Sequence, residues 1–311
     1  MPGTAAGGTG SGRKRWGWAA LMAGAFLAGL LLVGVVLIRA PEVERPTGDN
    51  LVNSPAAVPT FPVASDNGAA GQAPGPRLAI VVDDFGYDPV RDAEWLDFPG
   101  RITVSVLPYG PSSKSFAASA RTHGFGVILD VPMESKSGVA DRTEPYLLRL
   151  GMTPEEITDR FDRMAADVPQ ANGASNHMGS AFTSDLGAMA SFAQALKGKG
   201  FFFVDSVTSA GTVASMAMED AGVHATRRDV FLDDDGRAEE MRRQWAAVIA
   251  LAKERGEAIL LCHARSETRK ALLELLPQLH TEGIRPVTVE ELLAAPARTA
   301  HDAAGSHERN R

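Results

Sequence analysis

The sequence predicts an α/β fold in which buried parallel strands alternate with helices, as a (β/α) barrel or a doubly wound sheet. Short continuous apolar runs recur between residues 78 and 289, and such runs are typical of strands covered on both faces. Amphipathic helical patterns separate these runs, as expected for repeated strand–helix units. No glycine-rich dinucleotide motif follows the first run and no P-loop motif occurs, so a nucleotide-binding form of the fold is not supported.

Six apolar runs are expected to form the strands of the domain. Several of them end directly in an acidic residue, a histidine or a proline. The predicted strands are residues 78–82, 102–107, 126–131, 201–204, 258–261 and 286–289.

Four longer helices are expected between the later runs. The first has the clearest start signal, with Thr153 as N-cap, Pro154 at the first helical position and Glu156 at the capping-box position. It should extend to about residue 168. The others are expected from Ser184 or Asp185 to about 198, at 236–256, and at 266–281.

The N-terminal part of the chain predicts a membrane anchor. Residues 16–38 are apolar or small without a charge, which is the length needed to cross about 30 Å of hydrocarbon. Residues 13–15 are basic, so the positive-inside bias places the N-terminus in the cytoplasm and exports the rest. A cleaved signal peptide is the alternative, but its apolar region would be shorter and followed by a small-x-small site.

These features predict a single-pass inner-membrane protein whose C-terminal domain lies in the periplasm. The predicted parts are a cytoplasmic basic tail (1–15), the anchor (16–38), a flexible linker (39–77), one folded domain (78–295) and a disordered tail (296–311). A cytoplasmic metabolic barrel is disfavoured by the anchor.

Composition excludes two further classes. The net charge of −7, without a basic stripe, argues against nucleic acid as a partner, because phosphate contacts need an excess of Lys and Arg. The single cysteine, Cys262, cannot form an internal disulfide, and its apolar neighbours predict an inert core thiol.

Polar residues gather where the apolar runs end. Asp83 and Asp84 end the first run, Asp130 lies in the third with Glu134 four residues later, Asp205 and Ser206 end the fourth, and His263 follows the fifth. Because the carboxyl ends of barrel strands meet at one face, these side chains are expected to converge there.

A second cluster, residues 175–180, contains Asn176 and His177 among small residues and is expected to form a loop between helical segments. Imidazole and carboxylate ligands around a divalent cation, with a second carboxylate to accept a proton from water, suit metal-assisted hydrolysis. Each feature also has a simpler explanation. Aspartates cap helices and form turns, and histidines satisfy buried partners.

Seven segments resemble, in order, the divergent polysaccharide deacetylase family. They are L-A-I-V-V-D-D-F-G-Y (78–87), V-S-V-L-P-Y-G-P-S (104–112), V-P-M-E (131–134), N-H-M-G-S (176–180), F-V-D-S (203–206), R-D-V-F-L-D (228–233) and L-C-H (261–263). The resemblance implies a distorted (β/α) barrel of the carbohydrate deacetylase type, preceded here by the predicted transmembrane helix.

The resemblance also implies roles for individual residues. Asp83 would be the catalytic base, Asp84 a metal ligand, and His263 the catalytic acid or a neighbour of the metal. Asp205 and Ser206 would support the site.

The chain departs from this pattern at one motif. The better-studied deacetylases carry H-[ST]-x-x-H, and the corresponding stretch here, Asp130 to Glu134, has no histidine. His177 is therefore expected to replace the missing imidazole, with His263 as a further ligand.

The predicted function is hydrolysis of N-acetyl groups on an envelope polysaccharide or peptidoglycan-like glycan by a zinc-type site. Asp84, His177 and His263 are the predicted ligands, Asp83 and His263 the catalytic residues, and Asn176, Asp205, Ser206, Asp130 and Glu134 the supporting or substrate-binding residues. The alternative is a non-catalytic envelope protein that keeps the barrel to bind glycan or a cell-wall enzyme.

Overall fold

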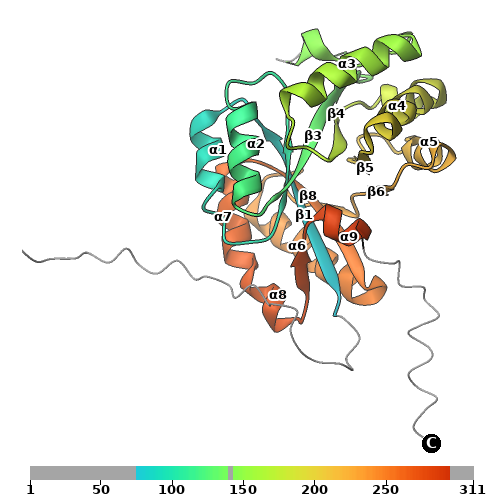
Figure 1. Cartoon of the computed structure of the whole chain (residues 1–311). Helices are drawn as coiled ribbons and strands as arrows, with labels where there is room; N and C mark the ends of the chain where they lie inside the picture. Colours follow the sequence, from blue (N-terminus) through green and yellow to red (C-terminus); the bar gives the residue numbers. More distant parts are fainter. Residues whose placement is uncertain (1–74, 139–142, 295–311) are drawn as a thin grey trace, which may run out of the picture. The chain divides into compact units, whose positions relative to one another are not determined.

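The structure, a computed structural model, describes residues 75–138 and 143–294 (Figure 1). The predicted basic tail, the membrane anchor, nearly all of the linker and the C-terminal tail lie outside these ranges and stay predictions. Within the described part of the chain, no helix is both long enough and apolar enough to cross a bilayer.

The described residues form one sheet of parallel strands with helices outside it (Figure 1). The strands are β1 (Arg77–Phe85), β2 (Thr103–Val106), β3 (Gly126–Met133), β4 (Gly173–Met178), β5 (Phe202–Asp205), β6 (Ala225–Arg227), β7 (Val230–Phe231), β8 (Glu257–His263) and β9 (Arg285–Val287). Their order is β6-β5-β4-β3-β2-β1-β8-β7, and β9 pairs with β1. All six predicted strands are present.

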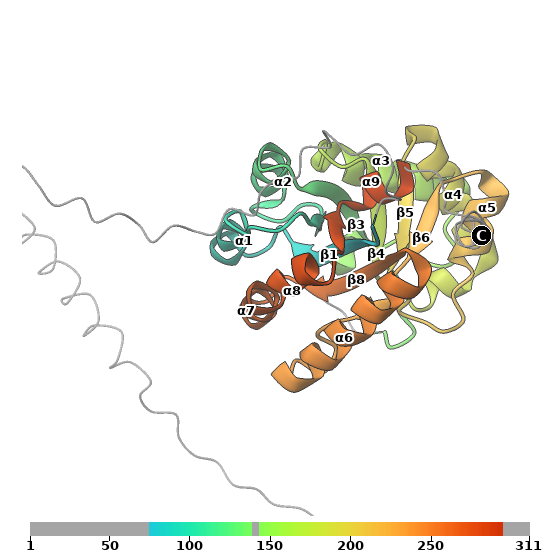
Figure 2. The same ribbon diagram turned by 90° about the horizontal axis from the view of Figure 1, so that it is seen from below.

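The helices follow the strands along the chain and surround them when the domain is viewed from below (Figure 2). They are α1 (Pro89–Trp95), α2 (Ser113–Thr122), α3 (Pro154–Asp167), α4 (Leu186–Lys199), α5 (Ala214–Ala221), α6 (Ala238–Arg255), α7 (Ser266–Leu275), α8 (Pro277–Thr281) and α9 (Val289–Ala294). Two short 3₁₀ turns lie at Glu144–Tyr146 and Phe182–Ser184.

The sheet is curled, and its two edge strands, β6 and β7, follow one another in the chain. β6 pairs with β5 on one edge, and after only Arg228 and Asp229 the chain enters β7, which pairs with β8 on the other edge. The amide of Arg228 donates to the carbonyl of Asp205 (3.0 Å), and the amide of Asp229 donates to that of Ile259 (2.9 Å). The expected curled (β/α) architecture is confirmed as a half-barrel of parallel strands whose edges these two residues bridge.

Side chains alternate along each strand between two cores. In β1, Leu78 and Ile80 belong to the larger core, whereas Ala79 and Val81 belong to a smaller inner one. The inner core also contains Ile128, Val204, Ile259, Leu261, Val287, Val289 and Leu292. The last two come from α9, which lies across the lower end of the strands (Figure 2). The inner core is therefore apolar, and the polar residues lie at the other end of the barrel, where the strands have their carboxyl ends.

Two predicted elements differ from the structure. Residues 175–180 are not a loop: β4 runs to Met178, held by parallel pairing with β3 and β5 although it lacks an apolar run. The helix predicted at 266–281 is two helices, α7 and α8, because Pro277 has no amide hydrogen for a continuous helix. The shorter helices, such as α1 and α5, gave too few turns to be recognised as a periodic pattern.

The predicted capping box at the start of α3 is confirmed. The hydroxyl of Thr153 accepts from the amide of Glu156 (3.2 Å), and the carboxylate of Glu156 accepts from the amide of Thr153 (2.8 Å).

We expect Thr153→Ala to lower the free energy of unfolding by about 1 kcal/mol, because the amide of Glu156 loses its hydrogen-bond partner at the start of α3. The measurement is urea unfolding of the variant and the parent chain. Thr158→Ala, which removes another hydroxyl from the same helix, is the matched control and should cost less than Thr153→Ala. Equal losses in both variants would contradict the capping role.

Candidate active site

The carboxyl ends of the strands surround a cavity of about 860 Å³. It brings together predicted site residues that lie far apart in the sequence. Its lining includes Asp83 and Asp84 from β1, Asn176 and His177 from β4, Ser206 after β5 and His263 from β8. The convergence expected from parallel strand ends is therefore present in the structure.

A β-bulge in β1 sets the directions of the two aspartates. Val82 pairs with Val104 and Phe85 with Val106, so β1 has one more residue than β2 between these pairs. Asp84 occupies the bulge with φ of 72°, a left-handed conformation that is uncommon for residues other than glycine. Bulges of this kind redirect side chains beside active sites, and here both Asp83 and Asp84 reach the cavity.

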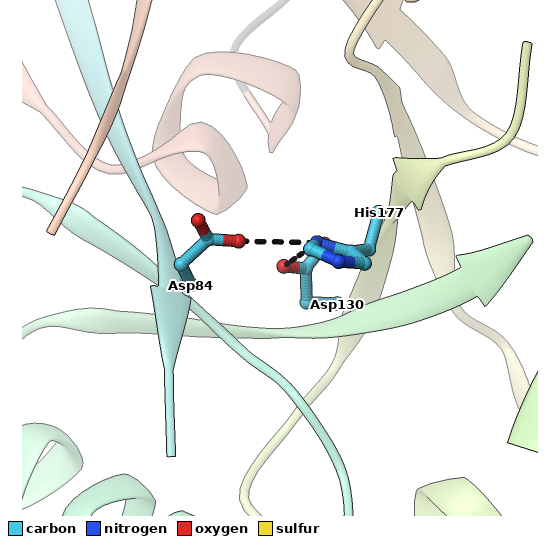
Figure 3. Close-up of side chains that lie close together, drawn as sticks. All are labelled: Asp84, Asp130 and His177. Carbon is cyan, nitrogen blue, oxygen red and sulfur yellow. Dashed lines mark ion pairs between the residues drawn. The ribbon is translucent and has the colours of Figure 1, made fainter. Parts of the chain in front are cut away.

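Asp84, Asp130 and His177 form a three-residue cluster whose potential ligand atoms lie within 4.8 Å of one another (Figure 3). The Nδ1 atom of His177 is 3.0 Å from Oδ1 of Asp84 and 3.5 Å from Oδ2 of Asp130. Asp130 is fully buried, and its Oδ2 has no hydrogen-bond partner among the described residues. A buried carboxylate oxygen in that state needs a compensating charge, so two carboxylates and one imidazole fit a divalent cation.

Two serines lie beneath this cluster. The hydroxyl of Ser175 is 3.3 Å from Oδ1 of Asp130 and 2.6 Å from the hydroxyl of Ser105 on β2, and both serines are fully buried. Ser175 and His177 are alternate residues of β4, so they share the inner face of the strand. The hydrogen bond fixes one carboxylate oxygen of Asp130 and leaves the other toward His177.

Asp83 is a buried carboxyl group beside the cluster. It is 7% exposed, and its Oδ1 has no hydrogen-bond partner among the described residues. Burial raises the pKa of Asp83 well above its usual value, and the charges of Asp130 and Asp84 raise it further, against a smaller opposing effect of His177. Raised carboxyl pKa values of this origin are typical of catalytic bases and acids.

His263, which was predicted to be a metal ligand, contacts the carboxylate of Asp233. Its Nδ1 is 3.0 Å from Oδ1 of Asp233, whose other oxygen accepts from the hydroxyl of Thr268 (2.6 Å). His263 is therefore not part of the three-residue cluster, which instead contains Asp130, predicted as a supporting residue. Because Nδ1 faces Asp233, its Nε2 is the ring nitrogen left for a reacting group.

Asp233 is the functional residue that sequence reasoning missed. The only signal for it was its place at the end of the R-D-V-F-L-D segment, three residues after the start of β7. It is 1% exposed. Burial alone would raise the pKa of Asp233, but the hydrogen bond and charge of His263 and the hydrogen bond from Thr268 outweigh it and hold the pKa below its usual value.

This lowered pKa predicts acid sensitivity. Asp233 contributes stability that is present above the pKa of an unfolded aspartate, about 3.9, and is lost as the pH falls through the lower folded pKa. We expect the free energy of unfolding of the parent chain to exceed that of Asp233→Asn at pH 6, with the difference shrinking below about pH 4. Urea unfolding across this range is the measurement, and a constant difference would contradict the assignment.

The remaining predicted residues shape the loops around the cavity. Asn176 accepts from the amide of Ser206 (2.9 Å) and donates to the carbonyl of Met178 (2.8 Å). Asp205 accepts from the amide of Val207 (2.8 Å) and from the hydroxyl of Thr212 (2.8 Å). Met178 and Val207 both have positive φ, at 56° and 50°. These bonds hold a strained backbone at the rim, which is typical of functional sites.

Two residues lie apart from the cavity. The carboxylate of Glu134 accepts from the amide of Leu150 (2.8 Å) and does not line the cavity. Cys262 is fully buried, its thiol lies 3.6 Å from the carbonyl oxygen of Val81, and burial raises its pKa well above the usual value. A thiol that stays protonated in the core is unreactive.

A family model and two bacterial proteins match most of the folded domain in sequence. A family model described as divergent polysaccharide deacetylase matches residues 80–293. YibQ of Escherichia coli K12 is 37% identical over 221 residues, covering 71% of this chain and 68% of its own. A Haemophilus influenzae protein is 35% identical over 192 residues, covering 62% of this chain and 68% of its own.

A solved structure shares the fold. The crystal structure of ATU2773 from Agrobacterium tumefaciens C58 superimposes with a TM-score of 0.68 at 24% identity, covering 72% of this chain and 92% of that one.

Proposed function

The chain belongs to the divergent polysaccharide deacetylase family, and we propose that it is a metal-dependent hydrolase that removes N-acetyl groups from a cell-envelope polysaccharide. The observation that carries the proposal is the grouping of Asp84, Asp130 and His177 around one point, with Asp83 and His263 lining the same cavity. The five side chains supply a cation site, a buried carboxylate and an oriented imidazole, which are the groups that amide hydrolysis requires.

Asp84, Asp130 and His177 would hold the cation, and we propose zinc, which accepts imidazole and carboxylate ligands and leaves positions open. When bound, the cation would polarise the acetamide carbonyl and acidify water. The hydrogen bond from Ser175 orients Asp130, as outer partners commonly do for metal ligands. A cation would also compensate the buried charge of Asp130.

Asp83 would accept a proton from the attacking water. The oxygen of that water would then bond to the acetyl carbon, and the bond from that carbon to the sugar nitrogen would break. His263 would give a proton to the leaving nitrogen, so the products are acetate and a free amino sugar. Asp233 holds and orients the imidazole through Nδ1. The two groups thus act as base and acid on one substrate.

The test is acetate release. The full chain, loaded with Zn²⁺, is expected to liberate acetate from N-acetylated amino-sugar oligomers and to bind about one cation per chain, measured by elemental analysis. Substoichiometric cation in the parent chain, in Asp84→Ala and in His177→Ala alike would contradict the metal site.

A non-catalytic glycan-binding barrel is the second candidate. It is favoured by the single imidazole in the cluster, where the motif of the better-studied deacetylases supplies two. Binding of amino-sugar oligomers without acetate release, unchanged by Asp83→Asn, would decide for this role.

The proposed site of action is the periplasmic face of the inner membrane, reached through the apolar segment 16–38 and the linker that follows it. An alkaline phosphatase reporter fused after Thr60 is expected to be active. An inactive fusion would contradict export and favour a cytoplasmic location of the domain.

A further inference from the structure

Arg228 occupies the place where the chain crosses from one edge of the sheet to the other, and it lines the cavity. Its guanidinium donates through Nε to the carbonyl of Ser206 and through Nη2 to the carbonyl of Val207 (3.0 Å). The side chain is half-buried. These two bonds fix the plane of the guanidinium and leave its Nη1 donors unused by any described residue.

Within the described residues, Arg228 forms no ion pair of the kind that the neighbouring arginines form. Arg237 and Arg243 also line the cavity, but each forms an ion pair, with Asp235 and with Glu240 respectively. No carboxylate among the described residues lies within 4.0 Å of the Arg228 guanidinium. A fixed, half-buried guanidinium without a carboxylate within ion-pair distance is able to bind an anion, because its planar donors match a carboxylate in geometry and charge.

Arg228 lies close to the reacting groups through a shared aromatic ring. The guanidinium carbon is 5.0 Å from the ring centroid of Phe231, and the imidazole of His263 is 5.0 Å from the same centroid. The two groups are therefore no more than twice that distance apart, so a disaccharide is long enough to contact both. Stacking on Phe231 further restricts the guanidinium.

Burial lowers the pKa of Arg228, while the charges of Asp205, Asp234 and Asp83 oppose the effect. An arginine so placed still carries its charge at neutral pH.

We propose that Arg228 binds a carboxylate carried by the substrate, so that the site selects an acidic, N-acetylated glycan over a neutral one. This inference rests on the proposed function, because it assigns the substrate class of the same cavity. Two chemistries supply such a carboxylate: a lactyl ether on the amino sugar itself, or a uronic acid next to it. Either would extend from the acetamide near Asp83 and His263 toward the Nη1 donors.

The test compares binding of matched acidic and neutral probes by calorimetry. One pair is the disaccharide of N-acetylglucosamine and N-acetylmuramic acid with its methyl ester, and the other is an N-acetylglucosamine–glucuronic acid disaccharide with its methyl ester. We expect the parent chain to bind the acid of one pair roughly 10- to 100-fold more tightly than its ester. The pair that shows the preference identifies which carboxylate is recognised.

Two variants separate recognition from structure. Arg228→Gln should abolish the preference while Arg228→Lys, which keeps the charge but not the planar donors, should retain part of it. Arg243→Gln is the matched control, since Arg243 lines the same cavity but is already paired, and should keep the full preference.

Equal binding of acid and ester by the parent chain would overturn the proposal. If Arg228→Gln weakened the binding of acid and ester equally, the proposal would also be overturned. Arg228 would then serve only to hold the backbone of Ser206 and Val207. Because binding is measured, acid preference without acetate release would refute the hydrolase while leaving this inference intact.

Discussion

Replacing His177 by alanine is expected to remove the bound cation and to lower the rate of acetate release on the order of 10³-fold. His177 supplies the only imidazole of the cluster and contacts both Asp84 and Asp130. Without it, only the carboxylates of Asp84 and Asp130 remain to hold the cation, and the several kcal/mol that a cation contributes to the transition state are lost. Elemental analysis and an acetate assay on the same preparation measure both effects.

His224→Ala is the control for this experiment, because His224 is exposed and does not line the cavity. It should keep the cation and the activity. If His177→Ala retained about one cation per chain, the ligand set proposed from the three-residue cluster would be wrong. If it lost the cation but kept its rate, the cation would be structural rather than catalytic.

The site residues that end recognisable apolar runs could be predicted from the sequence. Asp83 and His263 ended clear apolar runs, and the structure places them side by side as paired residues of β1 and β8. Parallel strands with their ends at one face were sufficient to expect this. The alternation of runs and helical patterns predicted parallel strands with helices but left a barrel and a doubly wound sheet both open, and only the family resemblance favoured the curled form.

The cluster of Asp84, Asp130 and His177 was harder to predict, because β4 has no apolar run. Its residues are Gly-Ala-Ser-Asn-His-Met, and pairing on both sides rather than hydrophobic pattern makes it a strand. Assigned to a loop, His177 had no defined face. As a strand residue it alternates with Ser175 on the inner face, directly toward Asp130. The place of Asp130 beside His177 depends on the pairing of β3 with β4, which the sequence alone did not indicate.

The bulge in β1 was also hidden from the sequence. Two consecutive aspartates in a regular strand point to opposite faces, so one of them would face the helices. The extra residue between Val82 and Phe85 and the positive φ of Asp84 bring both carboxylates to the cavity. Nothing in the run of apolar residues before Asp83 marks where such an irregularity occurs, because its position depends on the register with β2.

Asp83→Asn is expected to separate the chemistry from the fold. The amide keeps the shape of the carboxyl group but cannot accept a proton from water, so acetate release should fall roughly 10²- to 10⁴-fold. The cation should remain, because Asp83 is not among the three clustered ligands. The Arg228 preference for acidic probes should also remain.

The same change should stabilise the cation-free chain. In the parent, burial and the nearby carboxylates of Asp130 and Asp84 raise the pKa of Asp83, so its ionised form opposes folding at neutral pH. Removing that charge should raise the free energy of unfolding in EDTA on the order of 1 kcal/mol. Asp97→Asn, at an exposed position, should change neither property. A variant that was inactive and also less stable would show that Asp83 serves the fold. A gain in stability together with a loss of rate is instead expected of a carboxylate that destabilises the fold but is needed for the reaction.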